Sequence, residues 1–145
     1  MFRFKLEALL NHRRNQKEAA QKELAKAYRK LAAEREILDR KKEEKQENVK
    51  RLQAKKKECK NASDIKLYVN YIRKLSKDIE DQGVCVQNTA KMVDQKRDAL
   101  IAVMQKHKIL KRLKYKQRRA FEQQLMRDER KLMDELASIR HARKI

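Results

Sequence analysis

The stretch Lys60-Asn61-Ala62-Ser63-Asp64 interrupts a chain that otherwise reads as long polar helix with an apolar seam. Asn, Ser and Asp have short polar side chains that hydrogen-bond to nearby backbone, so they favour turns and caps over helix interiors. Asn61 can end one helix because Asn tolerates the left-handed conformation. Ser63 or Asp64 can cap the next helix by accepting from its free N–H groups. The stretch therefore predicts the tip of an antiparallel helical hairpin near residues 60–64.

The composition on both sides of this stretch favours very long helices. The 145 residues include no Pro and one Gly, the two strongest helix breakers, and charged residues make up 43%. Aromatic residues make up only 5%, too few for an ordinary compact core. We therefore expect an all-α fold, an elongated antiparallel two-helix coiled-coil hairpin that forms a single domain over residues 1–145. Its helices should cover about 3–59 and about 65–142, joined by a turn at 60–64.

A ladder of seven-residue spacing runs through the first helix and is typical of a coiled-coil seam. Lysines interrupt it, and apolar residues are sparse from Arg40 to Lys57, so we expect this part of the hairpin to be loosely held. The ladder consists of Leu10, Lys17, Leu24, Leu31, Leu38, Lys45, Leu52 and Cys59, with companions at Leu6, Ala20, Ala27, Tyr28, Lys42 and Val49.

The second helix carries a similar ladder, followed by a change of register near Leu110. Gly83, the only glycine, lowers helix stability by about 1 kcal/mol relative to Ala. It fits either a crowded helix crossing or a hinge. The ladder consists of Ile65, Ile72, Ile79, Val86, Val93, Leu100 and His107, with companions that include Tyr68, Val69, Leu75, Ala90, Val103, Met104 and Leu110.

The two expected helices differ in length. At a rise of 1.5 Å per residue, about 57 and about 78 residues span roughly 85 Å and 117 Å. With the chain folded at the tip, Phe2 would lie opposite about residue 120, so the residues from about Phe121 onward should overhang. An apolar stripe without a partner in its own chain is a binding face. The overhanging stripe consists of Phe121, Leu125, Leu132, Leu136 and Ile139.

The most concentrated positive charge lies just before this stripe. The chain carries 41 basic and 21 acidic residues, a net charge of +20, which fits nucleic acid, anionic lipid or an acidic protein surface as a partner. Elsewhere both signs are interspersed and keep the helices solvated, but no acid lies between Asp98 and Glu122. We interpret this interval as a docking surface for an acidic partner. Its basic residues include Lys106, Lys108, Lys111, Arg112, Lys114, Lys116, Arg118 and Arg119.

No set of residues suits catalysis or metal binding. The three histidines, His12, His107 and His141, are scattered, and none has a metal-ligating neighbour at suitable spacing. His107 falls on the second ladder, where we expect a packed polar residue, and a phosphate-binding loop needs several glycines. We therefore expect no enzyme activity, no cofactor and no metal site.

The cysteines and the N-terminus indicate a cytosolic protein. With the tip near Asn61, Cys59 and Cys85 would lie roughly 36 Å apart, which is too far for a disulfide. The N-terminus lacks the apolar core and the cleavage site of a signal peptide. No stretch approaches the length of about 18 apolar residues that a membrane span requires.

Nucleic-acid binding by a basic coiled coil is the main alternative function. A helix can enter the major groove when a basic region continues into a dimerising zipper and supplies base-reading side chains. Here the basic residues flank a seam that we expect to pair within the chain, and aromatic residues for stacking are not interleaved with them. We therefore do not expect nucleic acid as a partner.

The opening Phe2-Arg3-Phe4-Lys5-Leu6-Glu7-Ala8-Leu9-Leu10-Asn11-His12-Arg13 resembles the start of the flagellar export protein FliJ family. It combines alternating aromatic residues with Leu-Glu-x-Leu-Leu and a basic turn. The chain length, the break near residue 60, the stretch Tyr68–Leu75 and the basic C-terminal helix are also similar to that family. The lysines that interrupt the first ladder depart from the pattern and weaken the expectation of close pairing between Arg40 and Lys57.

The resemblance implies a non-catalytic component of the bacterial flagellar type III protein export apparatus, which serves motility and chemotaxis. FliJ-like proteins form an antiparallel two-helix coiled coil similar to the stalk of rotary ATPases. Their stalk inserts into the export ATPase ring, contacts the membrane export gate protein and handles export chaperones. The implied location is cytoplasmic and peripheral, at the inner face of the cell membrane. The stalk of a related virulence secretion system is the alternative within this class.

The implied partners divide the hairpin between its two ends, with the ATPase ring at the terminal end and the gate near the tip. Tyr is favoured at interfaces, and Tyr71 is the better exposed candidate, since Tyr68 and Ile72 share a helix face and could belong to the seam. The expected gate-binding residues are Tyr68, Tyr71 and Ile72. The expected ATPase-binding residues are Phe2, Phe4, Leu6, Lys111, Arg112, Lys116, Arg119, Phe121, Leu125 and Leu132. For Phe2, Phe4 and Leu6 the main expectation is a staple that packs the start of the first helix against the second.

Overall fold

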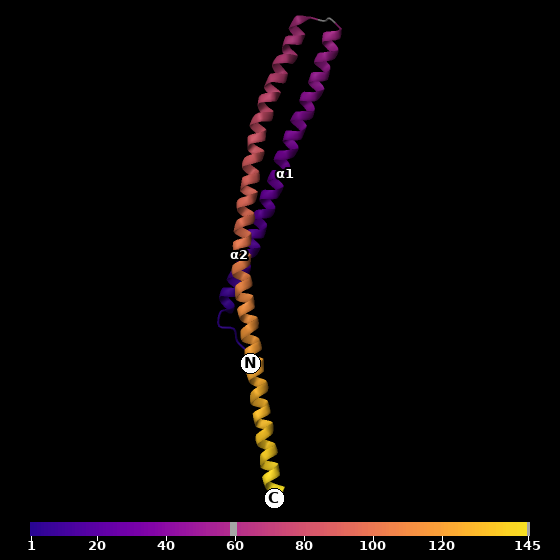
Figure 1. Cartoon of the computed structure of the whole chain (residues 1–145). Helices are drawn as coiled ribbons and strands as arrows, with labels where there is room; N and C mark the ends of the chain where they lie inside the picture. The colour runs from indigo at the N-terminus through magenta and orange to yellow at the C-terminus, as the bar shows by residue number, and fades with distance from the viewer. Residues whose placement is uncertain (59–60, 145) are drawn as a thin grey trace. The chain divides into compact units, whose positions relative to one another are not determined.

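The computed structural model describes residues 1–58 and 61–144, and these form two long helices that pack against each other. Helix α1 spans Glu7–Lys57 and has 51 residues, and helix α2 spans Ala62–Lys144 and has 83 residues (Figure 1). No strand is present in the described part of the chain. The predicted all-α two-helix hairpin is confirmed.

The start of α2 differs from the expected position, because the helix begins at Ala62 instead of near residue 65. The carbonyl of Asn61 accepts hydrogen bonds from the backbone N–H groups of Asp64 and Ile65, at 3.1 Å and 3.4 Å. Asn61 thus occupies the N-cap position that we expected for Ser63 or Asp64. Asp64 lies in the first helical turn, where the helix dipole favours a carboxylate. Cys59 and Lys60, which belong to the predicted helix end and turn, lie outside the described residues.

The N-terminal residues before α1 are not helical. The carbonyl of Phe4 accepts a hydrogen bond from the backbone N–H of Glu7 at 3.2 Å, so α1 begins at Glu7 instead of near residue 3. Glu7 places a carboxylate in the first turn, where the helix dipole favours it. Phe2 and Phe4 therefore lie in the non-helical chain before the helix, and both pack into one apolar cluster.

The chain divides into two compact units that each contain parts of both helices. Unit 1 comprises Met1–Ala19 and Ile101–Ile145, and unit 2 comprises Ala20–Leu100. In unit 2 the two helices run antiparallel, side by side, around a buried apolar cluster (Figure 1). This cluster contains Ala27, Leu31 and Val93, with Leu24, Val86 and Ala90 packed against them. The predicted ladders of the two helices therefore face each other in unit 2.

Polar residues occupy much of the remaining seam in unit 2. Gln82 is buried, and its Nε2 donates to the backbone carbonyl of Glu34 at 3.0 Å and to the Glu34 carboxylate at 2.5 Å. Asn48 is also buried and donates to the carbonyl of Glu44 at 2.8 Å. The expected ladder companions Tyr28 and Lys42 are exposed instead. The second row of α1 thus passes through polar residues, and a polar contact across a seam fixes the pairing of helices at a cost in stability.

Unit 1 has its own apolar cluster, which joins the N-terminus to α2. Its buried members are Phe4, Leu10 and Leu110, with Phe2 and Leu113 packed against them. At the edge of this cluster the Lys114 Nζ lies 2.9 Å from the Glu7 carboxylate. The rings of Phe2 and Phe121 are in contact at a centroid distance of 5.8 Å.

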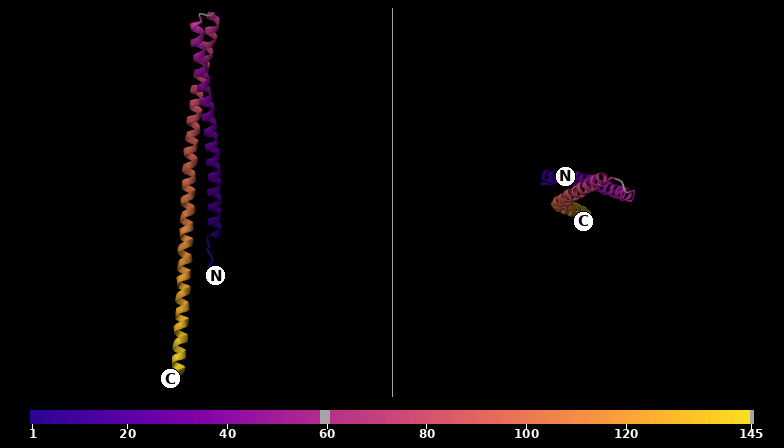
Figure 2. Two further views of the ribbon diagram at one scale, coloured as in Figure 1. Left: turned by 90° about the vertical axis from the view of Figure 1, so that its right-hand side faces the viewer. Right: turned by 90° about the horizontal axis from the view of Figure 1, so that it is seen from above.

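Beyond Phe121, α2 continues through unit 1 without a packing partner. Every described residue from 122 to 144 is exposed. Figure 2 shows this part of α2 extending past the N-terminal residues of the same unit. We call residues 122–144 the unpaired segment.

The burial of the unit 2 ladder makes a testable prediction, because α2 offers two valines in contrasting environments. Val93 is 2% exposed and Val84 is 56% exposed. Val93→Ala should lower the free energy of unfolding by about 2 kcal/mol, since it removes buried methyl groups and leaves a cavity. Val84→Ala, the matched control, should change it by less than about 0.5 kcal/mol. Urea unfolding followed by circular dichroism measures both, and equal losses would show that Val93 is not a core residue.

Candidate interaction surfaces

The aromatic residues at the N-terminus pack against the unit 1 cluster and are largely shielded from solvent. Phe4 is 7% exposed, and Phe2 is half-buried against the unit 1 cluster. Leu6, by contrast, is 40% exposed. These positions fit the staple that we expected for the N-terminus. They leave Leu6 as the residue of the three with most surface for a partner.

The basic residues predicted for the ATPase contact lie exposed on α2. Arg112, Lys116 and Arg119 line a shallow hollow of about 460 Å³ together with Tyr115. The Arg119 guanidinium lies 5.7 Å from the centre of the Tyr115 ring, within the range of a cation–π contact. Tyr115 is 61% exposed. An aromatic ring framed by cations therefore belongs to this surface, although the charge pattern alone did not single it out.

The unpaired segment presents a broad apolar face. Its predicted residues Leu125, Leu132, Leu136 and Ile139 are about half exposed or more, and Phe121, which precedes the segment, is 37% exposed. Sequence reasoning missed Met126 and Met133, which are 56% and 68% exposed. Both lie one residue after a stripe leucine, and this spacing is the signal that could have revealed them. Methionine side chains adapt to varied partners.

The three residues predicted to bind the gate do not share one environment. Tyr68 and Ile72 are half-buried, and the Lys55 ammonium lies 4.6 Å from the centre of the Tyr68 ring. Tyr71 is 40% exposed, and its hydroxyl donates a hydrogen bond to the carboxylate of Glu44 on α1. This hydrogen bond raises the pKa of Tyr71 above its usual value of 10.0. Tyr71 is thus the accessible member of the three.

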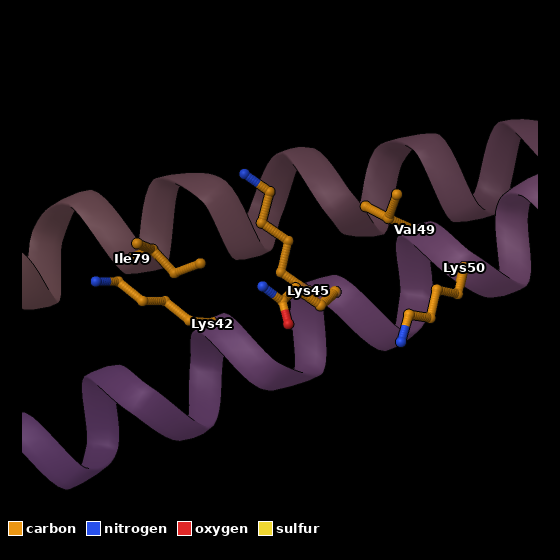
Figure 3. A pocket seen from close by; sticks show the side chains of 6 residues that line it. Lys42, Lys45, Val49, Lys50 and Ile79 are labelled. Carbon is orange, nitrogen blue, oxygen red and sulfur yellow. The ribbon is translucent and has the colours of Figure 1, made fainter.

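A lysine-rimmed hollow of about 480 Å³ lies in unit 2 and was not predicted. Figure 3 shows Lys42 and Lys45 of α1 reaching toward α2, with Ile79 of α2 facing them. Val49 contributes a further apolar wall, whereas Lys50 points away from α2. No ion pair within residues 1–58 and 61–144 includes these three lysines. The sequence feature that could have predicted this hollow is the set of lysines that interrupt the first ladder. Where a lysine replaces an apolar residue, the two helices lack an apolar contact.

Among the described residues of unit 1, His107 is the one buried titratable residue. Its side chain is 6% exposed, and its Nε2 is buried without a hydrogen-bond partner in the described part of the chain. Burial lowers its pKa below the usual 6.5, and the positive charges of Lys17, Lys111 and Arg14 lower it further. His107 is therefore neutral at physiological pH and packs in the seam, as its ladder position indicated.

Comparison with known proteins identifies a family for the whole chain. The model of the family described as "FliJ: Flagellar FliJ protein" matches residues 2–145. No curated protein and no solved structure matches the chain significantly. None of the described helices is both long enough and apolar enough to cross a membrane. The described residues contain no cluster of His, Cys, Asp or Glu that could hold a metal ion.

His107 predicts how stability depends on pH. Its pKa in the folded chain lies below the value of 6.5 for an unfolded chain, so the unfolded chain takes up the proton first as pH falls. The contribution of neutral His107 to the free energy of unfolding is therefore complete above about pH 6.5 and decreases as pH falls below that value. Replacing His107 with Leu should remove this part of the pH dependence between about pH 7.5 and 5.5, whereas the exposed His12→Leu should not. Urea midpoints at several pH values measure it, and identical profiles for the two variants would contradict the assignment.

Proposed function

The chain belongs to the flagellar FliJ protein family, a family of non-catalytic flagellar components, and from this premise we propose that it couples the export ATPase ring to the membrane export gate. Its role in general terms lies in flagellar export. In the proposed mechanism it is the stalk of the type III export apparatus and also escorts export chaperones. Membership in a family of non-catalytic components fits the expectation that the chain is not an enzyme.

The observation that carries this proposal is that the two units offer chemically different surfaces. Unit 1 has an apolar, unpaired helix next to an acid-free basic interval. Unit 2 has an exposed tyrosine and a lysine-rimmed hollow. A protein that connects two partners needs two such surfaces, because one partner must not displace the other.

The ATPase contact is assigned to unit 1. The exposed stripe from Phe121 to Ile139 would lie against apolar surface of the ring, since an amphipathic helix buries its apolar face when a groove is offered. The hollow at Arg112, Tyr115 and Arg119 would receive acidic side chains of the same ring. Charge sets the rate and orientation of docking, and the apolar stripe supplies most of the affinity.

The gate contact is assigned to unit 2, around Tyr71. The exposed ring of Tyr71 offers a large apolar area with a polar tip, which is typical of interface residues. Its hydroxyl is held by Glu44, so the ring is oriented before a partner arrives. We expect the chain to reach the inner face of the cell membrane on the cytoplasmic side through these partners and not by insertion.

Removal of the unpaired segment tests the ATPase contact. A chain that ends at Glu122 keeps the Phe2–Phe121 contact and the unit 1 cluster, so its thermal unfolding midpoint should change little. Its affinity for the purified export ATPase should fall by at least about tenfold, since it loses the apolar stripe. A full-length chain with Leu125, Leu132 and Ile139 replaced by Gln should lose a similar amount. Undiminished binding of both variants would remove the unpaired segment from the contact.

Truncation of Tyr71 tests the gate contact. Tyr71→Ala should weaken binding to the cytoplasmic domain of the gate protein by about tenfold, because an exposed interface ring is lost. The matched control is Tyr28→Ala, since Tyr28 lies in the same unit at 43% exposure and its hydroxyl accepts a hydrogen bond from Arg97 at 2.5 Å. Tyr71→Phe separates the ring from the hydroxyl. Equal effects of Tyr71→Ala and Tyr28→Ala in a binding titration would refute a specific role for Tyr71.

A further inference from the structure

A groove of about 340 Å³ in unit 1 lies between α1 and α2 and is distinct from the hollow at Arg119. Lys17 contributes to it from α1, and all its other residues belong to α2. The α2 residues Ile101, Met104, Lys108 and Lys111 follow one another at spacings of three and four, so they lie on one side of that helix over roughly 15 Å. Gln105 and His107 complete the lining.

The groove combines an apolar floor with a rim of one charge sign. Ile101 and Met104 are 46% and 42% exposed, although both are large apolar side chains. Lys17, Lys108 and Lys111 surround them, and no ion pair within the described ranges includes any of the three. Unpaired lysines beside exposed apolar side chains form a surface that lacks its counter-charge and its cover.

The environment of His107 is a second sign of positive potential at this place. His107 lines the groove, and the charges that act on it belong to Lys17 and Arg14 of α1 and to Lys111 of α2. All three are cations, and no carboxylate is among them. An anion in the groove would therefore meet attraction from both helices without competition from an acid close to His107.

We propose that this groove binds an acidic amphipathic helix of a partner protein, as a third helix laid along α1 and α2. One apolar side chain of the partner would cover Ile101 and Met104. Carboxylates three or four residues from it would approach Lys17, Lys108 and Lys111, since these spacings share one face of a helix. Apart from Lys111, this surface uses none of the residues assigned to the ATPase or the gate.

The shape and chemistry of the groove favour a helix over the other anionic partners. A lipid surface is broad, whereas the apolar floor here lies between two helices, with a lysine from each helix at the rim. A nucleic-acid strand would use the cations but would leave Ile101 and Met104 uncovered, and no Phe, Tyr or Trp side chain is among the lining residues to stack on a base. An amphipathic helix satisfies the floor and the rim together.

The experiment uses the full chain and a fluorescent synthetic helical peptide with Leu on one face and Glu three and four residues away. A second peptide carries Gln in place of each Glu. The groove variant replaces Lys17 and Lys108 with Gln. Its matched control replaces Lys131 and Lys144, which lie in the unpaired segment, so both variants lose the same charge. Fluorescence anisotropy at physiological salt measures affinity, and circular dichroism checks that helicity is retained.

The Glu peptide should bind the wild-type chain. Its affinity should be about tenfold lower for the groove variant and less than about twofold lower for the control variant. The Gln peptide should bind as poorly to the wild-type chain as the Glu peptide binds to the groove variant. Equal weakening by the two variants would overturn the proposal, because it would indicate general charge attraction. Absence of peptide binding to the wild-type chain would also overturn the proposal. A third contrary result would be that binding to vesicles of anionic lipid depends on Lys17 and Lys108, whereas binding of the peptide does not.

A measurement on the wild-type chain gives a second, independent test. A bound carboxylate would offset the cations around His107 and raise its pKa from its present lowered value. Nuclear magnetic resonance titration with the Glu peptide should move the His107 titration to higher pH, with the signals of His12 and His141 as internal references. An unmoved His107 titration at saturating peptide would place the peptide elsewhere on the chain and contradict the proposal.

Discussion

The pairing of one narrow ladder of side chains on α1 with another on α2 is the constraint on which the rest of the structure depends. Most of the buried apolar residues form two small clusters, one around Leu10 and Leu110 in unit 1 and one around Leu31 and Val93 in unit 2. Leu52 and Leu75 are buried outside these clusters. A pair of helices can bury only one stripe of each, so most of every helix surface stays in water. The same geometry that limits the core therefore leaves long helix faces available for partners.

Polar residues within the seam trade stability for a defined alignment. Gln82 reaches across to Glu34, and a helix pair that slid by one turn would leave its buried amide unsatisfied. His107 plays a different part, because its buried Nε2 has no partner in the described part of the chain and its neutral form is favoured by cations on both helices. The seam is thus less stable than an apolar one would be, but its alignment is defined.

Periodicity was sufficient to predict the two helices and the facing ladders, because apolar spacing reports directly which side of a helix is buried. The break was predicted from Asn61, Ser63 and Asp64, whose short polar side chains favour turns and caps. Of the ladder companions predicted from periodicity, four are exposed: Leu6, Tyr28, Lys42 and Met104. In unit 2 the second row of α1 instead runs through Glu34, which accepts a hydrogen bond from Gln82 of α2, and through buried Asn48, which donates to Glu44 of its own helix. The N-cap of α2 is Asn61 and not Ser63 or Asp64, because several neighbouring short polar residues are suited to an N-cap and the sequence alone does not distinguish them. The groove at Lys17 and His107 could not be predicted, because its two sides lie about 90 residues apart and meet only through pairing.

The unpaired segment also has a consequence for how binding can be observed. Its backbone hydrogen bonds all lie within one helix, and no packed side chains protect them, so they open at the low-stability end of the range for a folded chain. Amide hydrogens after Phe121 should exchange quickly, and proteases should cut there first. A partner that covers this face would slow both processes. The segment is therefore a built-in reporter, in which protection against exchange or cleavage signals that a partner is bound.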